Sequence, residues 1–166
     1  LVWSSEIEFT HRFPDGWSLV GAGHFQYAED MIEQALINVD PGTDAGIVRY
    51  QNRSDALYAV GGDLEARREF AAGWMFAANY TYLYAHYTKH GQSVANVPAH
   101  GASIRGVAPL GSGFRVAIRT TVEAPRRLPD HLDRFTDPAV IADLVVSGEA
   151  PRFGLDYALG LYNLFD

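Results

Sequence analysis

Apolar and polar side chains alternate with a period of two along most of this chain, and this alternation constrains the fold more than any other feature. The clearest case is residues 114–124, where Val116 and Ile118 alternate with Arg115 and Arg119. Successive side chains of a β-strand point to opposite faces, so this period predicts strands with one apolar and one charged face. The same period recurs in other segments, which together predict an all-β fold: residues 3–13, 60–70 and 153–162.

The connections between these segments are alternately short and long. Short turns are predicted at residues 14–16, 71–73, 111–113 and 148–151, and long polar loops at residues 38–46, 88–98 and 125–138. Transmembrane β-barrels have this layout, with short periplasmic turns at one rim and long extracellular loops at the other. The sequence therefore predicts an antiparallel up-and-down transmembrane β-barrel segment of about eight strands.

Aromatic residues lie near the ends of the predicted strands, most of them beside short turns. Rings at this height form the interfacial girdles of membrane barrels, because a ring can rest at the acyl boundary while its polar edge stays hydrated. Each of them alone could equally be a core residue of a soluble sheet, and it is their joint placement that favours a membrane. The residues are Trp3, Phe13, Trp17, Phe70, Trp74, Phe114 and Phe153.

The alternation does not by itself say which face meets lipid, since a soluble barrel would have its apolar residues inside. The loop lengths and the aromatic residues favour apolar residues outside and charged residues in the lumen. The predicted lipid-facing residues are Ile7, Phe9, Leu19, Leu64, Val116, Ile118, Leu144, Leu155 and Leu159. The predicted lumen-facing residues are Glu6, Glu8, Asp63, Glu65, Arg67, Glu69, Arg115, Arg119, Glu123, Asp143 and Asp156.

Composition and motifs argue against several other classes of protein. A net charge of −7 argues against a nucleic-acid partner, because the phosphate backbone requires a basic face. The sequence has neither a Gly-x-Ser-x-Gly elbow nor a Walker loop, so we expect no enzyme and no cofactor. His86 and His90 are four residues apart, but His90 falls in a predicted loop, so the helical spacing of a metal site is not met.

Charged and aromatic residues of the long loops are the best candidates for ligand contact, because loops on a rigid scaffold commonly carry function. An equally simple interpretation is that these side chains are only solvated. The first group, in the last long loop, is Arg126, Arg127, Asp130, His131, Asp133 and Arg134. The second group, around the middle loop, is Tyr84, His86, Tyr87, Lys89 and His90.

Three stretches, in order along the chain, carry a resemblance to a known family. Residues 50–66 contain Tyr-Gln-Asn followed by Gly-Gly-Asp-Leu-Glu-Ala. Residues 73–100 contain Gly-Trp, then Asn-Tyr-Thr-Tyr-Leu, then Asn-Val-Pro-Ala-His, and residues 162–166 read Tyr-Asn-Leu-Phe-Asp. Together they resemble the barrel region of TonB-dependent receptors.

The resemblance implies an energised transporter of the bacterial outer membrane, whose barrel has about 22 strands and a plugged lumen. It implies membrane lipid, a plug domain and the periplasmic TonB protein as partners, and a ferric siderophore or similar metal chelate as ligand. The chain contains no plug domain or TonB box, and the family's Asn-Leu-Phe-Asp stretch precedes one more strand. Residues 1–166 are therefore expected to be a partial barrel domain, without the plug and the last strand.

Two other functions fit the same pattern. One is a small outer-membrane barrel that stands alone as an adhesin or structural protein. The other is a soluble β-barrel that binds a small apolar ligand, in which Ile118 and Leu159 would be shielded in the interior. The exposure of these two side chains therefore separates the soluble alternative from the membrane barrels.

Overall fold

The computed structural model describes residues 1–37, 47–89, 93–128 and 133–165, and within them eight strands form one antiparallel sheet. The strand order is β1-β2-β5-β6-β7-β8-β9-β10, so each strand pairs with its neighbour in the up-and-down manner that the sequence predicted. The strands are β1 (Val2–Arg12), β2 (Trp17–Ala28), β5 (Leu57–Glu69), β6 (Met75–Tyr87), β7 (His100–Gly111), β8 (Phe114–Glu123), β9 (Ala139–Ala150) and β10 (Leu155–Leu161).

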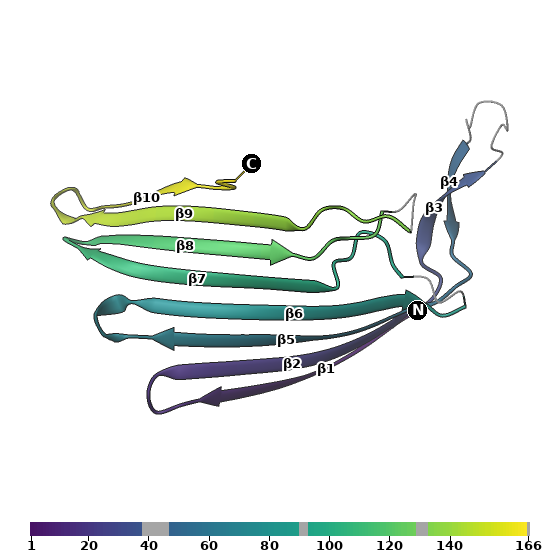
Figure 1. Ribbon diagram of the computed structural model, residues 1–166, viewed down its shortest axis with the longest axis horizontal. Helices are drawn as coiled ribbons and strands as arrows, with labels where there is room; N and C mark the ends of the chain where they lie inside the picture. The colour runs from purple at the N-terminus through teal and green to yellow at the C-terminus, as the bar shows by residue number, and fades with distance from the viewer. Residues whose placement is uncertain (38–46, 90–92, 129–132, 166) are drawn as a thin grey trace.

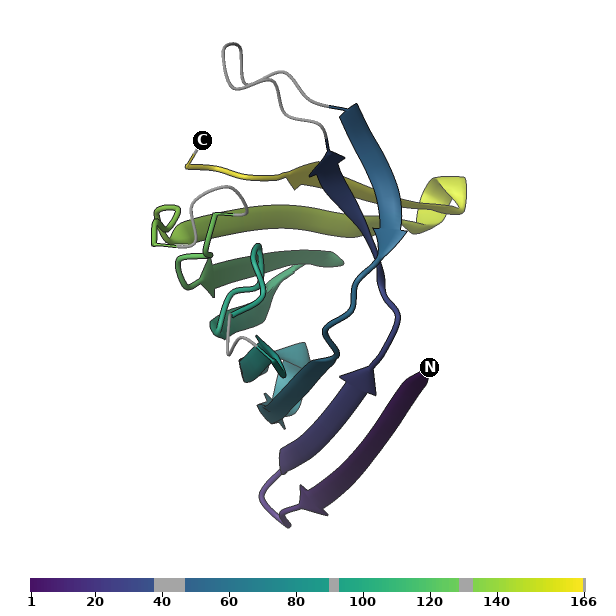
Figure 2. The same ribbon diagram turned by 90° about the vertical axis from the view of Figure 1, so that its right-hand side faces the viewer.

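The sheet is a long open arc (Figures 1 and 2). The chain's short turns all lie at one end of the strands, which we call the short-turn end, and the longer connections lie at the other, the long-loop end. A separate hairpin of β3 (Ile32–Ile37) and β4 (Ile47–Asn52) projects beyond the long-loop end. The chain leaves the eight-stranded sheet after Ala28 and returns to it at Leu57.

The short turns are where the sequence predicted them, with one exception. The β1–β2 turn uses Gly16 at a φ of +89°, a conformation that side chains other than glycine rarely adopt. Between β9 and β10 the turn is displaced toward the C-terminus. Strand β9 continues to Ala150, and the short 3-10 turn η2 (Pro151–Phe153) follows, so Phe153 lies in the turn and not in the last strand.

The apolar side chains of the sheet are exposed, and the described residues form almost no core. Ile7 is 77% exposed, Ile118 is 53% exposed and Leu159 is 70% exposed, as the prediction of an outward apolar face requires. The accessible surface is 11942 Å², whereas a compact soluble chain of 18.3 kDa exposes about 8,000 Å². The chain as described is therefore not folded around an apolar interior.

Aromatic residues border the short-turn end of this apolar face. Phe13, Phe70, Trp74 and Phe114 are each between 41% and 52% exposed, at the ends of strands or in the turns that join them. Trp3 is exposed at the opposite end of the sheet. Among the described residues, no helix is long and apolar enough to cross a membrane.

Candidate functional site

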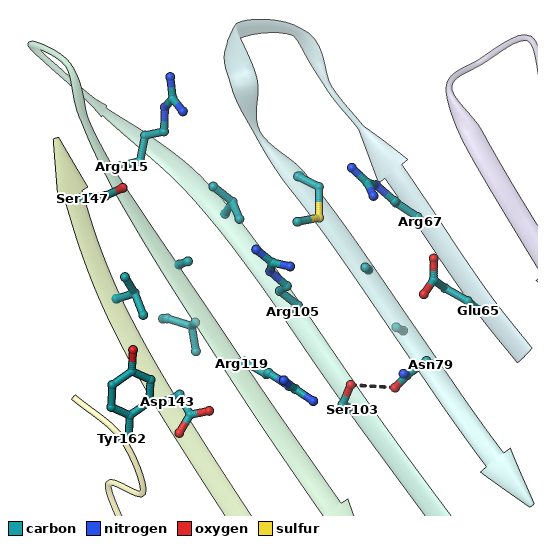
Figure 3. Close-up of a pocket in the computed structure, with 17 residues that line it drawn as sticks. Glu65, Arg67, Asn79, Ser103, Arg105, Arg115, Arg119, Asp143, Ser147 and Tyr162 are labelled. Carbon is teal, nitrogen blue, oxygen red and sulfur yellow. Dashed lines mark hydrogen bonds between the residues drawn. The ribbon is translucent and has the colours of Figure 1, made fainter. Parts of the chain in front are cut away.

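A polar hollow of about 670 Å³ lies on the charged face of the sheet (Figure 3). Side chains from five adjacent strands, β5 to β9, line this hollow, and Tyr162 after β10 closes one side of it. Because one hollow spans five strands, the charged face is the concave face of the arc, and the exposed apolar face is the convex one.

Strand register places the predicted lumen-facing residues on this one concave face. Residues that are direct partners on adjacent strands share a face, and the chain of partners Glu8, Ala22, Asp63, Thr81, Gly101 and Glu123 crosses six strands. By the same registers the remaining predicted residues lie on it too: Glu6, Glu65, Arg67, Glu69, Arg115, Arg119, Asp143 and Asp156.

One row of direct partners across the concave face carries four arginines, which we call the arginine row. It begins at Arg12, passes through Ser18 to Arg67, continues through Ala77 to Arg105 and Arg119, and ends at Asp143. Arg67, Arg105, Arg119 and Asp143 also line the hollow (Figure 3). The row therefore sets four positive charges along one line across this face.

The arginines of the row differ in how far their charge is balanced. Arg67 forms an ion pair with Glu69. Arg119 lies opposite Asp143 but forms no ion pair with a described residue, and the Asp143 carboxylate accepts a hydrogen bond from the backbone N–H of Asn163 at 3.1 Å. Arg105 has no ion pair with any described residue, and its direct partner on β8 is another arginine. The middle of the row is therefore short of negative charge.

Neutral and paired polar groups surround the row on the same face. The Ser103 hydroxyl donates a hydrogen bond to the Asn79 side-chain oxygen at 2.6 Å, and the Thr81 hydroxyl donates one to Asp63 at 2.6 Å. Arg115 lies 3.7 Å from Glu149. A planar guanidinium with free donors recognises carboxylate, phosphate and similar oxygen anions in a bidentate manner, so this wall can bind an anion.

The last long loop forms contacts within itself and with the neighbouring loop. Arg126 forms an ion pair with Glu123, and its backbone N–H donates to the Thr136 hydroxyl at 3.1 Å. The Arg127 guanidinium lies 4.7 Å from the centre of the Phe135 ring, and the Arg127 carbonyl accepts a hydrogen bond from Asn96 at 3.0 Å. These two arginines therefore stabilise the loop as well as being candidates for ligand contact.

The residues around the middle loop lie on two different faces. Tyr84 and His86 are on the convex face, where their rings stack with centres 4.1 Å apart and His86 approaches the Ser93 hydroxyl at 3.2 Å. Tyr87 is on the concave side of β6, with Arg53 3.7 Å above its ring. The Lys89 ammonium donates to the Ser54 carbonyl. The structure therefore does not bring this predicted group together as one site.

The remaining loop candidates add little to a described site. Asp133 and Arg134 are exposed, and the Arg134 carbonyl accepts a hydrogen bond from Leu128 at 3.0 Å. The predicted contacts His90, Asp130 and His131 lie outside the described residues. Ligand contact by the two loops stays a prediction.

Sequence reasoning missed Arg105 and did not include Arg12 among the site residues. Arg105 lies in a strand whose alternation is weak, because small residues such as Gly106 and Ala108 occupy the apolar positions. The signal that could have found it is Ile104, whose exposed apolar side chain fixes the face and leaves Ser103 and Arg105 on the other. The grouping of arginines into one row depends on register, which sequence alone does not supply.

Fold and surface together define the class as a segment of an antiparallel up-and-down β-barrel wall, apolar outside and charged inside. No protein-family model and no curated protein sequence matches the chain. Solved structures do match, and each match covers nearly the whole chain. The copper transporter OprC has a TM-score of 0.78 and 16% sequence identity over 99% of this chain. The ferric-catecholate import receptor Fiu of E. coli K12 has a TM-score of 0.66 and 21% identity over 98%, and the ferric yersiniabactin uptake receptor FyuA of Yersinia pestis has a TM-score of 0.69 and 19% identity over 99%.

These three neighbours are TonB-dependent receptors, transport proteins and not enzymes. The chain spans 25%, 23% and 25% of their respective lengths. The likeness shows the fold, which is that of part of such a barrel, and confirms the all-β class that the alternation predicted.

Proposed function

We propose that the chain is part of the barrel of an outer-membrane TonB-dependent receptor that takes up a scarce ligand, a ferric siderophore or a similar metal chelate. The single observation that carries the proposal is the division of the sheet into an exposed apolar convex face and a charged concave face. In a barrel this division places apolar side chains against lipid on the outside, and charged side chains against water or a polar domain in the lumen.

The division of faces also argues against the soluble alternative. A soluble β-barrel would enclose Ile118 and Leu159, whereas both side chains are more than half exposed on the convex face. A small outer-membrane barrel standing alone would share that face. The receptor is favoured over it by the sequence motifs and by the match of nearly the whole chain to about a quarter of three receptor chains.

The arginine row supports an anionic chelate as the ligand. Ferric complexes of catecholates and carboxylates carry oxygen-borne negative charge, which the guanidinium groups of Arg105 and Arg119 can bind. Fiu and FyuA are named for ferric chelates, whereas OprC is named for copper. In the complete protein the partners would include a plug domain in the lumen and the TonB protein in the periplasm.

The proposal can be tested on the complete protein that carries these residues. We expect it to fractionate with the outer membrane, to require detergent for extraction, and to change its migration in gels on heating. The purified protein should also bind the ferric complex of 2,3-dihydroxybenzoate, as measured by quenching of tryptophan fluorescence. Recovery as a monomer in buffer without detergent would contradict the membrane assignment, and membrane insertion without binding of any ferric chelate would contradict the ligand.

A further inference from the structure

Arg68 is the one charged side chain at a convex-face position of β5, and no described group accepts its hydrogen bonds. Its direct partners are Trp17 on β2 and Phe76 on β6, both aromatic. Its guanidinium lies 4.7 Å from the centre of the Phe70 ring and 5.6 Å from that of Trp17. Its Nε is buried and has no hydrogen-bond partner among the described residues.

An unpartnered guanidinium at this place needs an anion. A donor shielded from water without an acceptor destabilises a protein, and such groups in folded proteins are nearly always satisfied. The Phe70 and Trp17 rings lie beside the guanidinium, and Nε is its one buried nitrogen without a partner, so the donors of the two terminal nitrogens remain available to an anion. Arg68 is also the penultimate residue of β5, at the short-turn end of the sheet, the height at which the aromatic girdle places the headgroups of a membrane.

Apolar hollows lie on both sides of Arg68 on the convex face. On the β6 side a hollow of about 500 Å³ is bounded by Phe70, Trp74 and Phe76 and runs over Gly106 to Ile118. A Cβ atom built at Gly106 would meet nothing within 4 Å, so the floor of this hollow is open. On the β2 side a second hollow of about 390 Å³ is lined by Phe13, Asp15, Trp17, Ser18, Leu19 and Ala66, and most of its exposed lining is apolar.

We propose that Arg68 and these two hollows form a binding site for one phospholipid, with the lipid phosphodiester on the guanidinium and an acyl chain in each hollow. The inference rests on the proposed function, since it requires the convex face to lie against a membrane. The charge of Arg68 and the shape of the two hollows both indicate a phospholipid as the occupant. The anion must come from the headgroup region, and two apolar grooves flanking one cation match two chains attached to one phosphate.

Two substitutions test the two halves of the site separately in the complete protein. Arg68→Gln removes the charge, and Gly106→Leu fills the larger hollow without altering any charged group. Each has a matched control. Arg152→Gln removes a charge in the turn η2 at the same end of the sheet, and Gly101→Leu adds the same side chain to the same strand on the concave face, where it also meets open space.

The measurement is native mass spectrometry of each protein in detergent during titration with dioleoyl phosphatidylglycerol. Heat-modifiable migration is recorded for each variant to confirm that it is folded. We expect Arg68→Gln and Gly106→Leu each to weaken binding of the first lipid roughly tenfold, and both controls to bind like the wild type. Glycerol phosphate, which has the phosphate without the chains, is not expected to compete.

The outcomes separate this inference from the proposed function. A folded Arg68→Gln or Gly106→Leu protein that binds the lipid as tightly as the wild type overturns the inference and leaves the membrane barrel intact. Equal competition by glycerol phosphate also overturns it, because the apolar hollows would then contribute nothing. A wild-type protein that stays monomeric without detergent and binds no lipid overturns both.

Discussion

Arg105 of β7 and Arg119 of β8 are direct partners on the concave face of the sheet. Neighbouring strands are about 4.8 Å apart, so two guanidinium groups project side by side into the same hollow. Like charges in directly opposite positions destabilise a sheet. Such a pair is explained if the protein binds an anion between the two guanidinium groups.

Arg105→Gln should separate stability from binding. Removal of one of the two like charges is expected to leave the free energy of unfolding unchanged or to raise it by up to about 1 kcal/mol, because Arg105 has no carboxylate opposite it. Binding of ferric dihydroxybenzoate should weaken roughly tenfold. Urea unfolding in detergent and fluorescence titration measure the two quantities. Arg152→Gln is the control, and equal affinity of both variants for the chelate would show that the row does not bind it.

Ile118→Arg tests which face meets lipid. Ile118 is exposed on the convex face in the middle of β8, where arginine should lower the free energy of unfolding in a bilayer by about 2–4 kcal/mol. Its neighbour Ala117 points into the concave hollow, so Ala117→Arg should have a much smaller effect. Urea titration of the complete protein in lipid vesicles measures both. If the concave-face substitution were the more costly of the two, the assignment of the faces would be reversed.

Asp55→Ala tests the junction by which the chain re-enters the sheet from the β3–β4 hairpin. Asp55 is only 3% exposed, and its carboxylate accepts hydrogen bonds from the Thr88 hydroxyl at 2.8 Å and the Lys89 backbone N–H at 2.7 Å. Loss of this acceptor should destabilise the protein by about 1–3 kcal/mol, since both donors lose their partner. Asp137→Ala, at an exposed loop position, is the control for thermal unfolding. A change of equal size in both variants would refute the role of Asp55.

Ala72→Gly tests the turn between β5 and β6. Ala72 has a φ of +63°, a left-handed conformation that costs an L residue about 1–2 kcal/mol and glycine little. The substitution should therefore raise the free energy of unfolding by about 0.5–1 kcal/mol after the greater chain entropy of glycine is subtracted. Ala71→Gly in the same turn, where φ is not positive, should lower it by a similar amount. Changes of opposite sign in the free energy of unfolding of the two variants, measured by urea unfolding, would confirm the turn geometry.

The alternation of residues such as Val116 and Arg115 was enough to predict the fold class and the two faces, because side-chain direction in a strand depends only on the parity of position. Gly16 and Gly111–Gly113 likewise marked their turns, because local backbone conformation selects the residue. The β9–β10 turn was misplaced because Gly148 is not a turn residue. It lies in β9, packed against the Tyr157 side chain of the next strand, where an added Cβ would overlap the Tyr157 hydroxyl.

The sequence by itself determined that the chain forms strands with one apolar and one charged face, since that information is local. Only the tertiary structure decided that the charged face is concave, that Arg12, Arg67, Arg105 and Arg119 share one row, and that Arg68 lies between two apolar hollows. The physical reason is that register and curvature arise from pairing between strands far apart along the chain, and the period of two within each strand does not encode them.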